Sequence, residues 1–309
     1  MESKGNPLFV LTGCTAVGKT ELALRWAESR NAEIVSCDSL LFYRHIDIGT
    51  AKPTARERSR VPHHLIDIRM PSEQLDIGEY VGMAIQTVEE IWSRGRNVLV
   101  TGGSGFYLKA FFEPVVDRVL ISPATRAKVR QIEDKGGLEG MLKALKKIDH
   151  SCEEEIDTKN SRRVVKALER CLETGESVRT LKTRFQNQRN LLIDSKKNLV
   201  VLEREKSELN VRIEKRVIEM LDNGLINEVE RLKEFGFESN PSVVNAIGYR
   251  ETMEYLSGRY DRDTLIERIS TNTRQLAKKQ RTWFRTQLPN GKHVDLTDTQ
   301  LFDIDSLFN

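Results

Sequence analysis

The sequence predicts an α/β fold made of a parallel-sheet core and one inserted helical domain. In the first third of the 309-residue chain, short apolar and β-branched runs alternate with longer helix-like stretches, a rhythm typical of parallel α/β domains. From residue 118 to residue 197 the sequence is charged and helix-rich, with few strand-like runs. Another apolar run follows, so we assign residues 1–117 and 198–309 to the core and residues 118–197 to a helical insertion.

The expected elements of the core follow from these runs. Strands are expected where four-residue apolar or β-branched runs occur, at residues 8–11, 33–36, 97–100 and 199–202. Helices are expected in the amphipathic stretches 20–29, 76–94, 210–223, 225–235 and 263–287, the last ending before a Pro-Asn-Gly stop. Ligands of open α/β sheets bind beyond the carboxyl ends of the strands. The small and polar residues that follow the first three strands should therefore line one crevice.

Composition narrows the class of protein. The 49 basic and 46 acidic residues give a net charge of +3, which leaves room for a local basic face but not for a chain that is basic throughout. No apolar run approaches the roughly 20 residues that cross a bilayer, and no signal-peptide core is present. We therefore expect a cytoplasmic protein without a membrane span. Cys14, Cys37, Cys152 and Cys171 form no C-x-x-C pair and are expected to be reduced thiols.

A phosphate-binding motif lies between the first expected strand and helix. Residues Gly13, Cys14, Thr15, Ala16, Val17, Gly18, Lys19 and Thr20 match the pattern G-x-x-x-x-G-K-[ST]. The two glycines let backbone N–H groups turn toward phosphate oxygens, and the dipole of the following helix adds positive potential. Lys19 is expected to neutralise a terminal phosphate, and Thr20 to place its hydroxyl on Mg²⁺. The core is thus expected to be P-loop NTPase-like, and a glycine-rich turn with a helix N-cap is the structural alternative.

The ends of the second and third strands leave the chemistry open. P-loop ATPases and GTPases use a strand-end acid to hold the metal and position water, but the third strand is followed by T-G-G-S-G. The second strand is followed by Asp38 and Ser39. Taken alone, Asp38 fits a metal ligand, a helix N-cap or a general base equally well. Gly102 and Gly103 are either turn residues or mark a close approach of the backbone to a ligand.

Two basic clusters are candidate nucleic-acid surfaces. One has no Asp or Glu and encloses Trp283 and Phe284; its basic residues are Arg274, Lys278, Lys279, Arg281, Arg285 and Lys292. Such a stretch suits a phosphate backbone with an unstacked base, although a solvated helix whose aromatic residues pack into the core gives the same pattern. The second cluster, in the insertion, contains Arg162, Arg163, Lys166 and Arg170. The neighbouring residues His63 and His64 are expected to pack rather than to bind a metal.

The ordered motifs resemble those of the tRNA dimethylallyltransferases, also called tRNA isopentenyl transferases, over nearly the whole chain. They are residues 13–20 (G-x-T-A-x-G-K-T), 38–39 (DS), 47–53 (DIGTAKP), 62–67 (PHHLID), 102–107 (GGSGFY), 163 with 166–169 (R, KALE), 247–250 (IGYR) and 273–283 (TRQLAKKQRTW). The resemblance implies transfer of a dimethylallyl group from dimethylallyl pyrophosphate to N6 of the adenosine immediately 3′ of the anticodon in tRNA. It also implies a P-loop core whose helical insertion grips the anticodon stem-loop, with Mg²⁺ as cofactor and no protein partner, hence a monomer.

The resemblance also implies roles for individual residues. Residues 13–20 and Arg216 would hold the pyrophosphate, Asp38 would be the general base, and Lys19 and Ser104 would act beside the transferring group. Ser104 stands where the family usually has Thr, Cys14 replaces a Pro, Val17 a Ser or Gly, and Leu41 a Gln. The residues matching tRNA-contacting stretches are Asp38, Ser39, Leu40, Leu41, Ser104, Arg126, Arg162, Arg163, Val164, Val165, Lys166, Asn245, Ala246, Ile247, Gly248, Tyr249, Arg250, Lys278, Lys279, Gln280, Arg281, Thr282, Trp283, Phe284 and Arg285.

Three alternatives compete with this function. A P-loop kinase of a small metabolite or nucleotide would share the phosphate loop and use Asp38 to activate an alcohol. An adenylate isopentenyltransferase would prenylate free adenine nucleotides, but it would give the insertion and the basic helix no task. A non-catalytic RNA-binding protein would leave Lys19 and Thr20 without a purpose.

Overall fold

The computed structural model describes residues 6–117, 119–297 and 303–309. The chain divides into two compact units, one of residues Met1–Phe112 with Leu191–Asn309 and the other of residues Glu113–Asn190. Both boundaries lie a few residues before the expected ones. The short helix α9 (Leu191–Asp194) belongs to the larger unit because Leu192 is fully buried in that unit's core. Residues 115 and 117 belong to the smaller unit because they line a pocket there.

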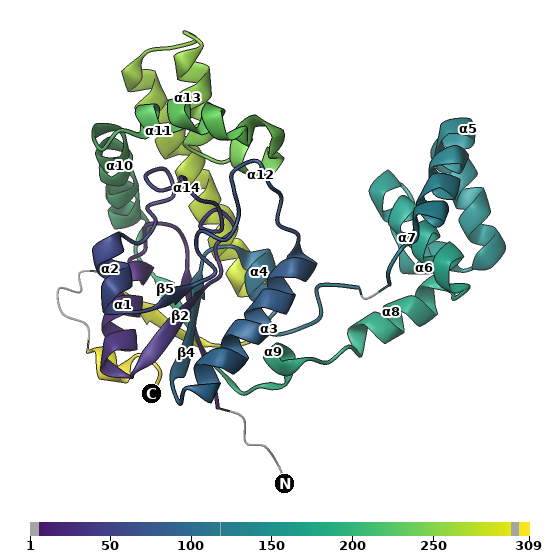
Figure 1. The fold of residues 1–309 in the computed structure, drawn as a ribbon, viewed down its shortest axis with the longest axis horizontal. Helices are drawn as coiled ribbons and strands as arrows, with labels where there is room; N and C mark the ends of the chain where they lie inside the picture. The colour runs from purple at the N-terminus through teal and green to yellow at the C-terminus, as the bar shows by residue number, and fades with distance from the viewer. Residues whose placement is uncertain (1–5, 118, 298–302) are drawn as a thin grey trace. The chain divides into compact units, whose positions relative to one another are not determined.

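A six-stranded parallel sheet with the order β3-β2-β4-β1-β5-β6 forms the centre of the larger unit (Figure 1). The strands are β1 (Leu8–Gly13), β2 (Ala32–Ser36), β3 (His63–His64), β4 (Asn97–Gly102), β5 (Lys197–Glu203) and β6 (Lys292–Asp295). The four expected strands are present, each slightly longer than its apolar run. The sequence did not indicate β3 or β6, because both are short, polar edge strands whose pattern carries little hydrophobic signal.

Helices pack around this sheet (Figure 1). Because the strands are parallel, their carboxyl ends all lie at the same edge of the sheet. The helices of the larger unit are α1 (Lys19–Ser29), α2 (Ala55–Arg60), α3 (Ile77–Ser93), α4 (Gly105–Lys109), α9, α10 (Lys206–Asp222), α11 (Leu225–Leu232), α12 (Pro241–Val244), α13 (Tyr249–Leu256) and α14 (Arg262–Gln287). Single 3₁₀ turns occur at Lys233–Phe235, Phe237–Ser239 and Ile304–Ser306. Local sequence sets several helix starts: Asp76 and Glu79, for example, form a reciprocal capping box at the start of α3.

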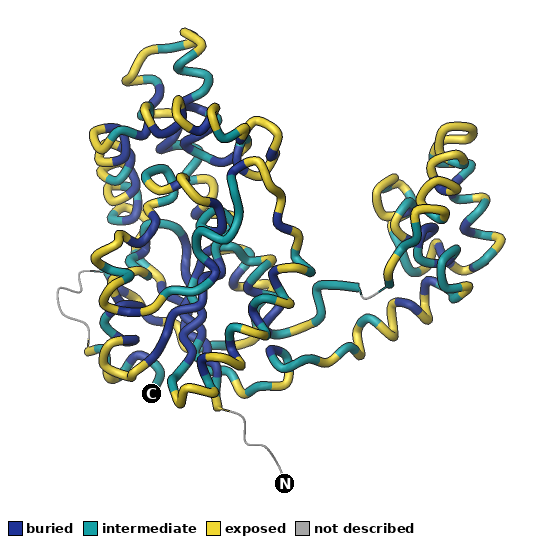
Figure 2. Tube along the Cα trace, viewed as in Figure 1, coloured by how far each residue is buried: buried dark blue, intermediate teal, exposed yellow. Residues whose placement is uncertain are grey.

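The core of the larger unit lies along the sheet. Strands β1, β2 and β4 are buried along nearly their whole length, as the dark segments in Figure 2 show. Continuous burial is expected for parallel strands covered on both faces, and it explains why these segments read as apolar runs rather than alternating ones. Within the described part of the chain, no helix combines the length and apolar character needed to cross a bilayer.

The described residues of the smaller unit form helices joined by loops. It contains α5 (Pro123–Ile148), α6 (Cys152–Glu155), α7 (Ser161–Thr174) and α8 (Val178–Gln186). Its separate core is built from apolar side chains of α5 and α7, including Met141, Leu145 and Leu168, so this unit has its own hydrophobic centre. Helix α5 is kinked at Gly137, which has a φ of 55°. All four cysteines of the chain are buried free thiols, as expected.

Candidate active site at the carboxyl ends of the strands

The loop between β1 and α1 has the geometry expected of a phosphate-binding loop. Gly13 has a φ of 154°, and a Cβ placed there would lie 2.7 Å from the carbonyl oxygen of Leu202. Gly18 has a φ of 114°, in the left-handed region that favours glycine. Within the described residues, the N–H groups of Ala16 and Gly18 donate to no protein acceptor. They therefore remain available to an anion at the start of α1.

Two arginines that the sequence did not single out for this purpose orient the peptide units of the loop. The Nε of Arg212, on α10, donates to the carbonyl oxygen of Ala16 at 2.9 Å. The Nε of Arg204, at the end of β5, donates to the carbonyl oxygen of Val17 at 3.2 Å. A planar trans peptide carries its C=O and N–H on opposite sides. Holding these carbonyls outward therefore turns the following N–H groups, including that of Gly18, into the loop.

Lys19 lies within the loop as expected. Its Nζ donates to the carbonyl oxygens of Gly13 at 2.8 Å and Cys14 at 2.9 Å. Burial lowers the pKa of Lys19 to about 8, and the nearby Asp38 carboxylate partly opposes this shift. An ammonium group with poor hydration gains more from an incoming phosphate than an exposed one would. Thr20, the next residue of α1, is exposed at the start of the helix.

Asp38 faces this loop. Electrostatic interactions couple its carboxylate to Lys19 and to Arg216, so the three charged groups share one crevice. Its Oδ1 also accepts the N–H of Leu40 at 3.2 Å, which closes a local turn. Ser104 supports the same turn: its Oγ accepts the N–H of Ser39 at 3.0 Å and donates to the Ser39 hydroxyl at 3.2 Å. The carboxylate thus lies near the phosphate loop, on a segment after β2 that Ser104 holds in place.

The glycines after β4 are explained by protein packing rather than by a ligand. A Cβ on Gly102 would lie 2.1 Å from the carbonyl oxygen of Cys37, and one on Gly105 would lie 2.6 Å from the ring of Trp283. A Cβ on Gly103 would lie 2.8 Å from Nε2 of Gln280. These glycines allow α14 and the segment after β2 to approach the end of β4 closely.

Arg216 reaches the crevice from α10. Its Nη2 donates to the carbonyl oxygen of Thr50 at 3.1 Å, and burial lowers its pKa. The segment that supplies this carbonyl is held by the buried carboxylate of Glu228, a residue that sequence reasoning missed. Glu228 accepts three successive backbone N–H groups, from residues 47, 48 and 49, at 3.0, 2.7 and 3.1 Å. It also accepts the hydroxyl of Tyr249 at 2.6 Å.

Several residues expected to contact tRNA are not on the surface. Tyr249 and Val164 are fully buried, Phe284 is 5% exposed and Ala246 is 8% exposed. Tyr249 packs against Gly49 and binds Glu228, Val164 lies in the core of the helical unit, and Phe284 and Ala246 lie in the core of the larger unit. Their side chains therefore stabilise the fold, and we correct their assignment as direct tRNA contacts. The expected face of α14 keeps its charges: Lys278, Lys279, Arg281 and Arg285 are all exposed.

Tyr249→Phe distinguishes the two roles of this residue. Removing a hydrogen bond to a buried carboxylate is expected to cost about 1.5–3 kcal/mol of stability. The midpoint of urea unfolding should fall at an unchanged m-value, while tRNA affinity stays the same. Tyr255→Phe, on the same helix but without a hydrogen bond from its hydroxyl in the described structure, is the matched control. Weaker tRNA binding with no change in unfolding would return Tyr249 to the tRNA surface.

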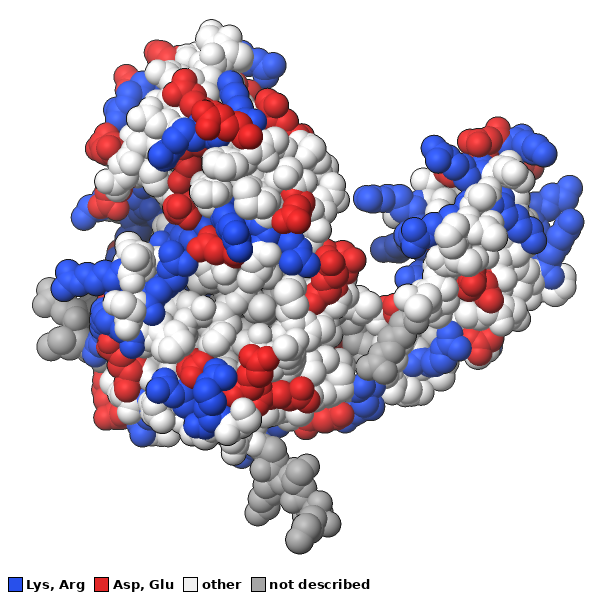
Figure 3. Space-filling view, in the orientation of Figure 1, with Lys and Arg blue, Asp and Glu red and all other residues white. Residues whose placement is uncertain are grey.

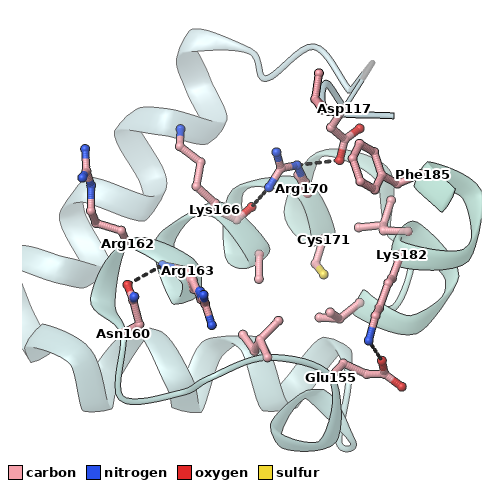
Figure 4. Close-up of a pocket in the computed structure, with 15 residues that line it drawn as sticks. Asp117, Glu155, Asn160, Arg162, Arg163, Lys166, Arg170, Cys171, Lys182 and Phe185 are labelled. Carbon is pink, nitrogen blue, oxygen red and sulfur yellow. Dashed lines mark hydrogen bonds and ion pairs between the residues drawn. The ribbon is translucent and has the colours of Figure 1, made fainter. Parts of the chain in front are cut away.

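The second basic cluster borders a pocket of about 500 Å³ in the helical unit (Figure 4). Arg162, Arg163 and Lys166 line it from α7, and its floor contains apolar side chains such as Leu181. Arg170 is held there by an ion pair with Asp117 at 2.7 Å. Arg126, on α5, is exposed elsewhere on this unit, which carries many Lys and Arg side chains on the face seen in Figure 3. Arg163 and Lys166 are also ion-paired, with Asp157 at 3.9 Å and with Glu169 at 2.9 Å.

The described residues contain no group of three or more His, Cys, Asp or Glu side chains that could hold a metal ion. His63 and His64 form β3, where His64 bonds to Glu33 at 2.6 Å and His63 to the carbonyl oxygen of Val61 at 2.7 Å. Both side chains are half-buried and held by these hydrogen bonds. An exposed Thr20 hydroxyl beside a phosphate loop fits a Mg²⁺ ion that is held mainly by substrate phosphates and water.

The fold and the site together define a P-loop α/β enzyme with a basic helical insertion. A family model described as IPP transferase matches residues 41–287. The chain belongs to this family, the tRNA dimethylallyltransferases, and is a prenyltransferase.

Individual relatives agree with this assignment. A protein from Opitutus terrae named tRNA dimethylallyltransferase is 53% identical over 93% of this chain and 92% of its own length. The crystal structure of a tRNA isopentenylpyrophosphate transferase from Bacillus halodurans is 33% identical and aligns with a TM-score of 0.69, covering 97% of this chain and 92% of that one. A eukaryotic dimethylallyltransferase crystallised acting on tRNA is 25% identical and aligns with a TM-score of 0.80, over 98% and 77%.

Proposed function

We propose that this enzyme transfers a dimethylallyl group from dimethylallyl pyrophosphate to N6 of the adenosine immediately 3′ of the anticodon in tRNA, releasing pyrophosphate. The observation that carries the proposal is the electrostatic interaction of the Asp38 carboxylate with both the Lys19 ammonium and the Arg216 guanidinium beside the phosphate loop. Cations on one side suit a departing diphosphate, and a carboxylate on the other suits an attacking amine. The missing strand-end acid is then explained, because no water has to be directed at a γ-phosphate.

The phosphate side of the crevice would stabilise the leaving group. Breaking the bond between C1 of the dimethylallyl group and the diphosphate oxygen leaves negative charge on that oxygen. Lys19, Arg216 and the N–H groups of residues 16 and 18, which have no protein acceptor within the described residues, would be the donors for this charge. Mg²⁺ would add further positive charge when it is bound with the diphosphate at Thr20.

The carboxylate side would activate the acceptor. The adenine N6 amine is a weak nucleophile because its lone pair is delocalised into the ring. As the bond from N6 to C1 forms, Asp38 would take one proton from N6. Ser104 would keep Asp38 in position through its bonds to Ser39, a task that needs only the hydroxyl it shares with threonine. The adenine must leave the stacked anticodon loop to reach Asp38, at a cost of a few kcal/mol.

The partners follow from this reaction. We propose that the anticodon stem-loop is bound by the exposed basic face of α14, by Leu40 and Leu41, and by Asn245 and Arg250. Arg126, Arg162, Arg163 and Lys166 of the helical unit would also bind it. A tRNA substrate implies that the enzyme acts in the cytoplasm. The reaction requires no second copy of the chain, so we propose a monomer with the core at residues 1–112 and 191–309 and the tRNA-gripping insertion at residues 113–190.

Removing charge from α14 should weaken tRNA binding. Lys279→Ala and Arg281→Ala are each expected to lower affinity and to reduce the slope of log K against log salt by about one, because one phosphate contact is lost. The measurement is tRNA binding at several salt concentrations. Arg262→Ala, at the other end of α14 and ion-paired with Asp222, is the control. An unchanged slope in the two variants would place Lys279 and Arg281 outside the interface.

The test of the function uses two labelled donors. Purified enzyme is incubated with tRNA and either dimethylallyl pyrophosphate labelled in the prenyl group or ATP labelled in the γ-phosphate. Label is expected in tRNA from the first donor only, and in adenosine N6 after nuclease digestion. Phosphoryl transfer from ATP would support a P-loop kinase instead. Equal activity on AMP and on tRNA would indicate an adenylate isopentenyltransferase.

A further inference from the structure

The side chain of Gln280 forms a hydrogen bond with one of the backbone amides of the phosphate loop. Its Oε1 accepts the N–H of Thr15 at 2.8 Å, although the two residues are 265 positions apart in the chain. Its Nε2 donates to the carbonyl oxygen of Gly103 at 2.8 Å. Both ends of the side-chain amide are therefore used, and the side chain joins α14, the phosphate loop and the end of β4.

The packing around Gln280 holds it in this place. Gly103 leaves no room for a Cβ beside Nε2 of Gln280, and Gly105 allows the ring of Trp283 to approach from the next turn of α14. Ala277 and Phe284, which flank Gln280 on the same helix, are buried in the core. The amide is thus a fixed part of the wall of the loop.

The occupied amide lies at one particular end of the loop. In P-loop proteins that bind triphosphates, backbone amides cradle the inner phosphates and the lysine reaches the outer ones. Here the Lys19 ammonium lies against the carbonyl oxygens of Gly13 and Cys14, directly before Thr15. The N–H groups of Ala16 and Gly18, farther along the loop, have no protein acceptor within the described residues.

We propose that Gln280 is a specificity-determining residue that closes the outer end of the phosphate loop and so restricts it to a diphosphate. Two phosphate groups can use the amides of residues 16 and 18 and the Lys19 ammonium without Thr15. A third group at the outer end would meet the Gln280 side chain and find the Thr15 amide already bonded. The inference deepens the proposed function, on which it rests, because it explains how a P-loop enzyme can choose a prenyl diphosphate over the abundant nucleoside triphosphates.

The test compares inorganic pyrophosphate with inorganic tripolyphosphate, so that neither a base nor a prenyl group contributes. Binding of each anion to the full chain is measured by calorimetry at constant free Mg²⁺. Coulomb attraction to a basic loop would by itself favour the more highly charged tripolyphosphate. We nevertheless expect the unsubstituted enzyme to bind pyrophosphate more tightly, by about tenfold or more, the free-energy equivalent of one hydrogen bond to a charged group.

Two substitutions test the residue. In Gln280→Ala the Thr15 amide and the outer end become free, and we expect the preference to disappear or reverse. Gln280→Asn, which is one methylene shorter, should reduce the preference less. Gln275→Ala, at an exposed position of the same helix, should keep the preference of the unsubstituted enzyme. Thermal unfolding of each variant establishes that it is folded.

Several outcomes would overturn the proposal. An unsubstituted enzyme that binds tripolyphosphate as tightly as pyrophosphate refutes it without any variant. So does an unchanged preference in folded Gln280→Ala. Failure of the proposed function is seen separately, in the labelled-donor experiment. A diphosphate preference that depends on Gln280 would stand even if the transferred group were not dimethylallyl.

Discussion

Asp38→Asn is expected to lower kcat for prenyl transfer by about 100-fold or more, the usual contribution of a positioned general base. Asparagine keeps the shape of the side chain and an oxygen that can accept the N–H of Leu40, so the local turn should survive. It cannot take a proton from the attacking amine. Affinity for tRNA should hardly change, because the loss falls on the transition state rather than on binding of the substrate.

The measurement is single-turnover transfer with saturating tRNA and donor, together with tRNA binding at equilibrium. Asp222→Asn, a change of the same type on an exposed carboxylate paired with Arg262, should leave kcat unchanged. Substantial turnover in Asp38→Asn would show that Asp38 is not the general base and that it only stabilises the local turn. Asp38→Ala should lose as much turnover and, in addition, some stability of the turn.

Local motifs explain what the sequence predicted well. The phosphate loop is specified by eight consecutive residues, and Gly13 and Gly18 have positive φ values that favour glycine. The strands next to it read as apolar runs because a parallel sheet buries them on both faces. The placement of Asp38 followed from a rule about parallel sheets rather than from pairing information. The structure of these features is determined mainly by residues that are close together in the sequence.

The interactions that the sequence did not predict join distant segments. Gln280 meets Thr15 across most of the chain, and Glu228 binds a segment that precedes it by about 180 residues. In the sequence, Gln280 and Glu228 look like ordinary polar residues of a helix. Tyr249 is another case that the sequence could not decide. Its place in a family motif indicated that the residue matters, but not whether its side chain points into the core or toward the surface. Its hydroxyl points inward to Glu228, so the constraint on it is packing and a buried hydrogen bond rather than RNA contact.

Removing the charge of Lys19 should have the second large effect. Lys19→Met is expected to lower kcat/KM for the donor by about 100- to 1000-fold, as loss of one preorganised donor to developing negative charge commonly does. The side chain lies inside the loop, where its ammonium donates to two carbonyl oxygens. Binding of tRNA alone should be unaffected. An exposed lysine at the start of α10, changed in Lys206→Met, serves as the control.

The pH dependence of the unsubstituted enzyme tests the same residue without a mutation. Burial lowers the pKa of Lys19 to about 8, so the ammonium of the free enzyme is lost as the pH rises through that value. The kcat/KM for the donor, which reports the free enzyme, should therefore fall above about pH 8. A bound diphosphate raises the pKa of the ammonium by charge attraction, so kcat should persist to higher pH and donor binding should take up a proton. This alkaline fall in kcat/KM should be absent from Lys19→Met. A fall of equal size in the variant would assign it to another group and leave the charge of Lys19 outside donor recognition.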